Sequence, residues 1–176
     1  GYHFSQMKVS DLCLMNQNGE LVYGKERTGD AAQSIHSNIY KSRPDINAVA
    51  HAHPMYGKTF STLNKELKPI TQDSCAFYKR TATFTDYDGV ANGPDEGINI
   101  AKALAEKDFL ILQNHGILTT GTMVETTLWY FLNMEEACKS QLLAEAVGEP
   151  IVIPDKVAIH TRDYVANDLS AFASIQ

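Results

Sequence analysis

Three histidines stand at positions where they could hold a divalent metal ion. His51 and His53 close an apolar, β-branched stretch at residues 46–51, and His115 follows another apolar stretch at residues 109–112. Side chains at positions i and i+2 of a strand point to the same face, so the imidazoles of His51 and His53 can approach one ion. Three protein ligands that leave one position open are typical of a catalytic metal site. We therefore predict that His51, His53 and His115 are metal ligands.

The metal itself is less well specified than its ligands. Zinc accepts imidazole nitrogen readily and is the first expectation, while three imidazoles also suit Fe(II) or Mn. A His-x-His pair at the end of a strand also occurs as a structural or surface feature, so the alternative of no metal stays open.

The elements that would position these histidines follow from hydrophobic periodicity. It predicts helices over residues 30–43, 54–63, 94–105 and 123–147, and a terminal helix within residues 151–176. Strands are predicted at residues 11–15, 21–23, 46–51, 81–85, 109–112 and 117–120, and a short one starting at Ile70. Asn18-Gly19 predicts a hairpin turn. The mixture indicates an α/β sandwich with a mainly antiparallel central sheet.

Bulk composition narrows the class of protein. The 176 residues suit a single domain over residues 1–176, with 44% hydrophobic and 20% charged residues. The net charge of −6 and the lack of a basic cluster speak against a nucleic-acid partner. No apolar run is long enough to predict a membrane span. Three cysteines without a Cys-x-x-Cys spacing favour reduced thiols in a cytoplasmic protein.

Two stretches carry a resemblance to a known family. The first is Ile35-His36-Ser37, Tyr40, Arg43-Pro44-Asp45 and Asn47 to Pro54; the second is Leu110 to Leu118, followed by the long helix with Glu135 and Ala137. Their order and spacing resemble the class II aldolase/adducin family. The resemblance implies a three-layer α/β/α fold, a metal, usually zinc, on the three histidines, and a homotetramer with its active site between subunits. Because the chain has no initiator methionine and starts near the family's phosphate loop, we expect it to be truncated at its N-terminus relative to the family.

Two departures from the family pattern limit the substrate. The sugar-phosphate aldolases carry an acid/base glutamate at the position of Ala32, and serines that grip phosphate at Asp30 and Ala31. Alanine cannot carry a proton, and a carboxylate repels phosphate. A phosphorylated sugar is therefore not expected, and the chain resembles the adducin-head branch that also lacks the glutamate.

Other polar residues are candidates for the remaining roles. Asp73 could replace the missing base, with Gln72 beside it, although a solvated loop is the plainer interpretation. Gln33 and Tyr87 are candidates for substrate binding. Tyr78 and Asp88 also lie in the regions where a site is expected, and the run from Tyr87 to Gly89 also fits a simple turn.

Three functions remain in competition at this stage. The first is a metal-dependent lyase that cleaves a small unphosphorylated oxo or hydroxy acid by retro-aldol reaction or decarboxylation, since a divalent ion stabilises the enolate that both reactions need. The second is an Fe(II) oxygenase that decarboxylates oxidatively at the same three histidines. The third is an adducin-like interaction module without catalysis, against which the complete histidine triad speaks.

Overall fold

A computed structural model describes residues 3–24, 29–87, 89 and 94–175 of the chain. They form two compact units, residues 1–44 with 90–101 and residues 45–89 with 102–176. Each unit is described by itself below. The prediction that the whole chain is one domain stays a prediction.

The first unit holds a small hairpin and a helix. Two short 3₁₀ helices, η1 (Phe4–Gln6) and η2 (Val9–Asp11), precede the antiparallel strands β1 (Leu14–Met15) and β2 (Leu21–Tyr23), and α1 (Asp30–Ser42) follows. The predicted turn is confirmed, because Gly19 has a φ of 82°. The strand predicted from residue 11 is wrong in its first part, since the Asp11 carboxylate accepts the Lys8 N–H at 2.8 Å and closes η2 instead. Most of α3 (Pro94–Leu104) also belongs to this unit.

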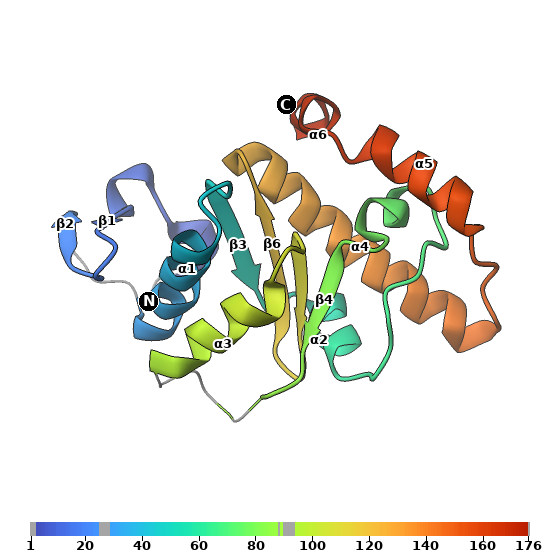
Figure 1. The fold of residues 1–176 in the computed structure, drawn as a ribbon, viewed down its shortest axis with the longest axis horizontal. Helices are drawn as coiled ribbons and strands as arrows, with labels where there is room; N and C mark the ends of the chain where they lie inside the picture. Colours follow the sequence, from blue (N-terminus) through green and yellow to red (C-terminus); the bar gives the residue numbers. More distant parts are fainter. Residues whose placement is uncertain (1–2, 25–28, 88, 90–93, 176) are drawn as a thin grey trace. The chain divides into compact units, whose positions relative to one another are not determined.

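The second unit contains a four-stranded sheet in the order β3-β6-β5-β4 (Figure 1). The strands are β3 (Ala48–Ala52), β4 (Thr81–Phe84), β5 (Phe109–Leu112) and β6 (Gly116–Gly121). β6 pairs antiparallel with both β3 and β5, whereas β4 pairs parallel with β5. The sheet is therefore mainly antiparallel, as predicted. Its one parallel pair follows from the long connection between β4 and β5, which includes a helix.

Two helices of this unit lie against the sheet. The short α2 (Met55–Ser61) and the long α4 (Val124–Val147) contact each other and β6. The core between them is built from fully or almost fully buried side chains: Phe60, Phe77, Phe109, Ile117, Tyr130 and Met134. Among the described residues, no helix is long and apolar enough to cross a membrane.

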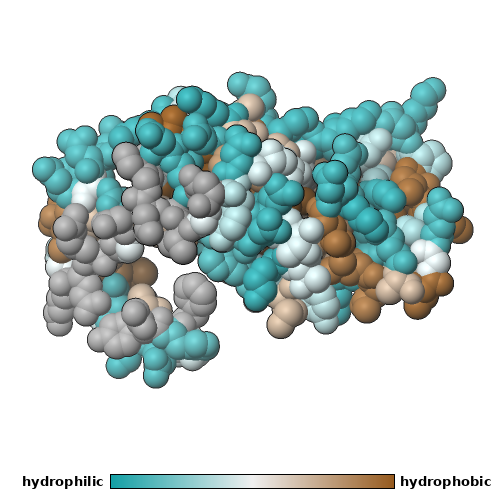
Figure 2. All heavy atoms as spheres, turned by 90° about the horizontal axis from the view of Figure 1, so that it is seen from below, coloured by the Kyte–Doolittle hydropathy of each residue, from teal (hydrophilic) through white to brown (hydrophobic). Residues whose placement is uncertain are grey.

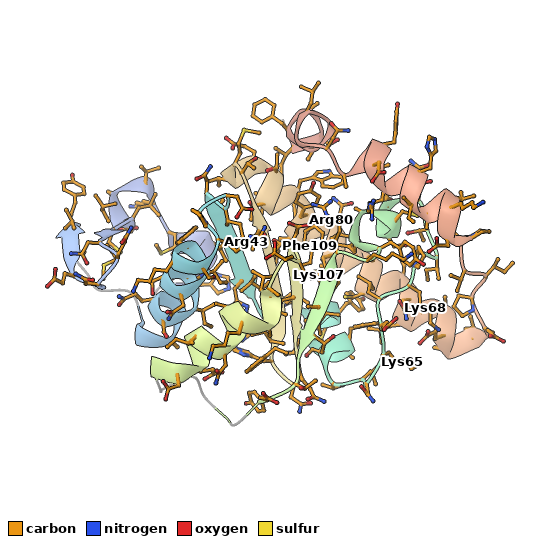
Figure 3. All side chains as sticks on the ribbon, viewed as in Figure 1. Arg43, Lys65, Lys68, Arg80, Lys107 and Phe109 are labelled. Carbon is orange, nitrogen blue, oxygen red and sulfur yellow. The ribbon has the colours of Figure 1, made fainter. Side chains whose placement is uncertain are left out.

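An arginine joins the ends of two strands to this core. Arg80 precedes β4, and its guanidinium lies 4.9 Å from the centre of the Phe109 ring and 5.3 Å from that of Tyr130 (Figure 3). Its Nε donates to Asp108 Oδ2 at 2.8 Å. The starts of β4 and β5 are thus held together by one cation that contacts both aromatic rings and an anion.

Two expectations about this unit need correction. No strand begins at Ile70, because the Ser74 hydroxyl accepts the N–H groups of Ile70 and Thr71 and leads the backbone into the 3₁₀ helix η3 (Asp73–Phe77). The C-terminal segment holds two helices rather than one, α5 (Asp155–Val165) and α6 (Asp168–Ile175).

Large hydrophobic side chains stay exposed along α4. Val124, Leu128 and Leu132 follow one another at the helical spacing of four, and Val147 at the far end is 90% exposed. Figure 2 shows hydrophobic surface concentrated at the right of the view, the side on which Figure 1 places the C-terminal half of α4. Apolar surface of this extent is a feature of proteins that associate.

Candidate metal centre

The three predicted histidines come together at one end of the sheet. The ring centres of His51 and His53 are 5.2 Å apart, those of His51 and His115 are 5.0 Å apart, and those of His53 and His115 are 4.4 Å apart. One nitrogen atom of each ring lies within 4.8 Å of the corresponding atoms of the other two. Residues separated by more than sixty positions in the chain thus offer three nitrogen atoms to one point.

His51 is oriented by the neighbouring strand. It lies in β3 opposite Leu118 of β6, and its Nδ1 is 2.9 Å from the carbonyl oxygen of Ile117. A carbonyl oxygen only accepts, so Nδ1 carries the proton and Nε2 keeps its lone pair. A metal-binding histidine commonly donates its other ring N–H in this way, which fixes both its tautomer and its orientation.

His115 sits in a tight turn between β5 and β6. Its N–H donates to Leu112 O at 3.0 Å, and Asn114 before it has a φ of 56°. Asparagine tolerates this left-handed conformation better than most residues. The Asn114 N–H donates to Ser61 O, the last residue of α2, at 3.0 Å. The turn that presents His115 is therefore tied to α2 as well as to its own strands.

Burial and charge keep the cluster suited to metal binding. His51 and His115 are partly buried, and His53 is exposed. Burial, together with the nearby His53, lowers the pKa of His115, so its imidazole is neutral at neutral pH and can donate a lone pair. The exposed edge at His53 leaves the cluster open to solvent on one side.

These donors fit a divalent ion. In a tetrahedral zinc site the metal–nitrogen distance is about 2.0–2.1 Å, which puts two ligand nitrogens about 3.4 Å apart. Separations of at most 4.8 Å between the three ring nitrogens need only small ring rotations to meet that geometry. Three imidazoles with an open side match a catalytic site better than a closed structural one.

A carboxylate on α4 holds the start of α2, the helix that begins just after His53-Pro54. Glu135 Oε1 accepts the Tyr56 N–H at 2.9 Å, and Oε2 accepts the Gly57 N–H at 2.6 Å. In the sequence, Glu135 stands out only as part of the family pattern, without a role of its own. The contact joins residues that are 79 positions apart, so no local sequence signal could have revealed it.

The other candidate residues of this unit lie in different surroundings. The exposed Tyr87 has its ring centre 6.1 Å from that of His115. Gln72 and Asp73 are exposed at the start of η3, which packs against α5 and α4. Tyr78 donates to Asp155 Oδ1 at 2.8 Å. Asp88 lies outside the described residues. Tyr87 is thus placed beside the cluster, and the catalytic roles of Gln72 and Asp73 stay predictions.

Gln33 belongs to the first unit, where it helps to line a cavity of about 510 Å³. The other lining side chains include Cys13, Met15, Ala32, His36 and Tyr40. The Gln33 amide lies against Gly19, so closely that a Cβ there would be 1.5 Å from Gln33 Nε2. Burial lowers the pKa of His36, which is therefore neutral at neutral pH. The substrate-binding role of Gln33 stays a prediction.

Comparison with known proteins agrees with this geometry. The family model described as Class II Aldolase and Adducin N-terminal domain matches residues 1–142. The chain is 37% identical over 174 residues to decarboxylase NovR of Streptomyces niveus, covering 98% of this chain and 64% of that protein. It is also 37% identical to the 4-hydroxy-3-prenylphenylpyruvate oxygenase/4-hydroxy-3-prenylbenzoate synthase of Streptomyces roseochromogenus subsp. oscitans, covering 98% and 63%. The chain thus spans less than two thirds of both relatives.

A solved structure supports the fold. L-fuculose 1-phosphate aldolase from Glaciozyma antarctica PI12 superposes with a TM-score of 0.87 at 41% identity, over 98% of this chain and 67% of that one. The predicted α/β sandwich with a mainly antiparallel sheet is thereby confirmed.

Proposed function

The chain belongs to the class II aldolase and adducin family, and from this membership we propose that it is a metal-dependent carbon–carbon lyase for a small, unphosphorylated oxo or hydroxy acid. The observation that carries the proposal is the convergence of His51, His53 and His115, with ring nitrogens within 4.8 Å of one another and one open side. A divalent ion bound there would supply Lewis-acid stabilisation of negative charge on the substrate oxygens.

The candidate residues have distinct parts in this proposal. The Ile117 carbonyl holds His51 in the tautomer that leaves Nε2 available. Tyr87, whose ring centre lies 6.1 Å from that of His115, is a proposed contact for a substrate that enters from the open side. Gln33 is a second proposed substrate contact. Asp73 is the proposed substitute for the missing base, with Gln72 beside it.

Decarboxylation is favoured over retro-aldol cleavage. Residue 32 is alanine, so the acid/base glutamate of the sugar-phosphate aldolases has no counterpart at this position. Loss of carbon dioxide does not require a base to remove a proton from carbon, and it tolerates this replacement better. The relative from Streptomyces niveus is named a decarboxylase, which supports the same choice.

An Fe(II) oxygenase that decarboxylates oxidatively is the second candidate. One relative at 37% identity is named an oxygenase as well as a benzoate synthase. Three imidazoles accept iron as well as zinc, and availability and geometry decide between them. Zinc remains the metal that we expect first, and Fe(II) and Mn are the other candidate metals. An adducin-like interaction module would need no metal at all.

The experiment that separates these functions begins with metal content. Protein purified without added metal is subjected to elemental analysis, and carbon dioxide release from a panel of 2-oxo acids is measured with and without oxygen. Stoichiometric metal and oxygen-independent release support the lyase, whereas iron with matched oxygen consumption supports the oxygenase. A protein without metal affinity contradicts both, and His115→Ala serves as the control that removes one ligand.

Assembly and location complete the proposal. We propose a homo-oligomer, most simply a tetramer, because α4 exposes a stripe of Val124, Leu128 and Leu132. We also propose a cytoplasmic location, which suits the free thiols of Cys13, Cys75 and Cys138.

A further inference from the structure

The Glu135 carboxylate points inward from α4 and uses both of its oxygen atoms on α2. Its partners are the N–H groups of Tyr56 and Gly57, at 2.9 and 2.6 Å. They lie in the first turn of α2, where N–H groups have no partner within the helix. Burial and the charge of Glu135 raise the pKa of Cys138, less than one turn further along α4, to about 12. Glu135 therefore binds α2 to α4 through charge-assisted hydrogen bonds.

The two ends of the helix held in this way adjoin the segments that carry His53 and His115. Pro54, which directly follows His53, is the N-cap of α2. Ser61, its last residue, accepts the N–H of Asn114, the residue before His115. Both ends of this seven-residue helix are thus joined to segments that carry an imidazole.

The middle of α2 lies against Ile117, the residue that orients the third histidine, His51. A Cβ at Gly57 would lie only 2.9–3.1 Å from side-chain atoms of Ile117, so α2 approaches β6 as closely as a glycine allows. The carbonyl of the same Ile117 accepts the Nδ1–H of His51. A shift of α2 relative to the sheet would therefore displace Ile117, the residue that orients His51.

From these contacts we infer that Glu135 is a positioning residue, which sets the mutual geometry of His51, His53 and His115 by fixing α2 to α4. The inference rests on the proposed function, since it assigns Glu135 a part in holding the metal ligands. It differs from a plain helix cap, which would stabilise α2 without changing how the imidazoles meet. Glu135 does not itself belong to the ligand set.

The test compares three variants of the full chain. Glu135→Gln preserves volume but offers an NH₂ group where the second oxygen was, and Glu135→Asp keeps the charge but withdraws both oxygens. Glu125→Gln is the matched control, because Glu125 is an exposed carboxylate in the first turn of the same helix. Zn²⁺ affinity is measured by competition with a chromophoric chelator, and the absorption spectrum of Co²⁺-loaded protein reports ligand geometry. In metal-free protein, NMR records the ring signals of His51 and His53 and the amide exchange of Tyr56 and Gly57.

In both Glu135 variants we expect faster exchange of the Tyr56 and Gly57 amides, while the circular dichroism spectrum remains that of a folded protein. Zn²⁺ affinity should fall about tenfold, the lower end of the loss seen when an outer-shell partner of a metal ligand is removed. The Co²⁺ spectrum should change, and Glu125→Gln should behave like the wild type. Faster amide exchange with unchanged affinity, spectrum and ring signals would overturn the inference, because Glu135 would then be a cap alone.

The failure of the proposed function looks different. In that case the wild type binds no Zn²⁺, or the His51→Ala variant binds Zn²⁺ as tightly as the wild type does. The ring signals in metal-free protein still decide the positioning role: displacement in Glu135→Gln beyond that in Glu125→Gln supports it, and unchanged signals overturn it.

Discussion

Gly116 and His53 lie so close that no side chain fits between them. A Cβ on Gly116 would be 3.0 Å from Cδ2 of His53 and 2.5 Å from the carbonyl oxygen of Ala52. The first residue of β6 is therefore in direct contact with the end of β3. Because His115 precedes Gly116, this contact brings the rings of His53 and His115 to a separation of 4.4 Å.

Replacing this glycine should disturb the cluster. Gly116→Ala adds a methyl group where there is no space for it. We expect this substitution to lower the free energy of unfolding by about 1–3 kcal/mol. Displacement of His53 should also weaken Zn²⁺ binding about tenfold or more. Urea denaturation and chelator competition measure the two effects. Gly148→Ala is the control, since a Cβ there meets nothing within 4 Å; equal effects of the two substitutions would contradict the prediction.

The position of the missing glutamate can be tested by putting it back. The family pattern aligns Ala32 with the acid/base residue of the sugar-phosphate aldolases, so Ala32→Glu should add an anion near the cation. We expect tighter metal binding and lower native activity, because the new carboxylate would compete for the open position. Competition with a chelator measures the affinity, and Ser42→Glu at the exposed end of the same helix is the control. Equal affinities in wild type and Ala32→Glu would show that residue 32 does not face the metal.

Phosphorylated sugars should not be substrates. The family pattern aligns Asp30 and Ala31 with the phosphate-gripping serines of the aldolases, and a carboxylate repels a phosphate dianion. We expect no cleavage of fuculose or rhamnulose phosphate, measured by coupled detection of the aldehyde and dihydroxyacetone phosphate products. Turnover of about 1 s⁻¹ or faster, an ordinary enzymatic rate, would refute the alignment.

The loop before η3 should lose stability in acid through Glu145. Its carboxylate accepts from Lys65 Nζ at 2.6 Å, Lys68 Nζ at 3.1 Å and Gln141 Nε2 at 3.1 Å, and the bond from Lys65 is the largest cause that lowers its pKa to about 2 (Figure 3 labels both lysines). A carboxylate whose pKa falls on folding stabilises the protein above its unfolded pKa and loses that contribution as the pH drops towards the folded one.

Glu145→Gln should therefore cost about 1 kcal/mol of unfolding free energy at pH 7, a modest value because both lysines are nearly half exposed. The difference from the wild type should shrink as the pH falls from 5 towards about 2. Urea denaturation at several pH values measures it, with Glu136→Gln as a control on an exposed pair. A difference that stays constant with pH would contradict the assignment.

The exposed stripe on α4 should take part in assembly. Leu132→Glu puts a charge on a side chain that is 52% exposed and follows Val124 and Leu128 at helical spacing. We expect the native protein to be a tetramer in light scattering and the variant to dissociate, because a charge at an apolar contact is left unpaired. A monomeric wild type at micromolar concentration would contradict the prediction, while Val157→Glu on α5 tests whether the effect is specific to the stripe.

Local patterns in the sequence determined much of this protein. Helical spacing located α1 and α4 to within a few residues, because burying one face of a helix imposes that spacing on the side chains. A fully apolar run located β5, and the Asn18-Gly19 turn located β2 as the return strand of a hairpin. The alternation of side chains along an extended strand predicted that His51, in β3, and His53, just beyond its end, share one face. The apolar stretch before His115 selected it as the third member, and the structure brings its ring beside the other two.

Tertiary structure alone decided how these pieces meet. The two hydrogen bonds of Glu135 to α2, the close approach of Gly57 to Ile117 and the carbonyl that orients His51 all join residues far apart in the chain. At Ile70 the local β preference lost to the Ser74 hydroxyl, which satisfies two backbone N–H groups in a turn. Contacts of this kind depend on which surfaces pack together in the folded protein. The amino-acid sequence shows the local spacing of residues, but not the distance between remote segments that pack against each other.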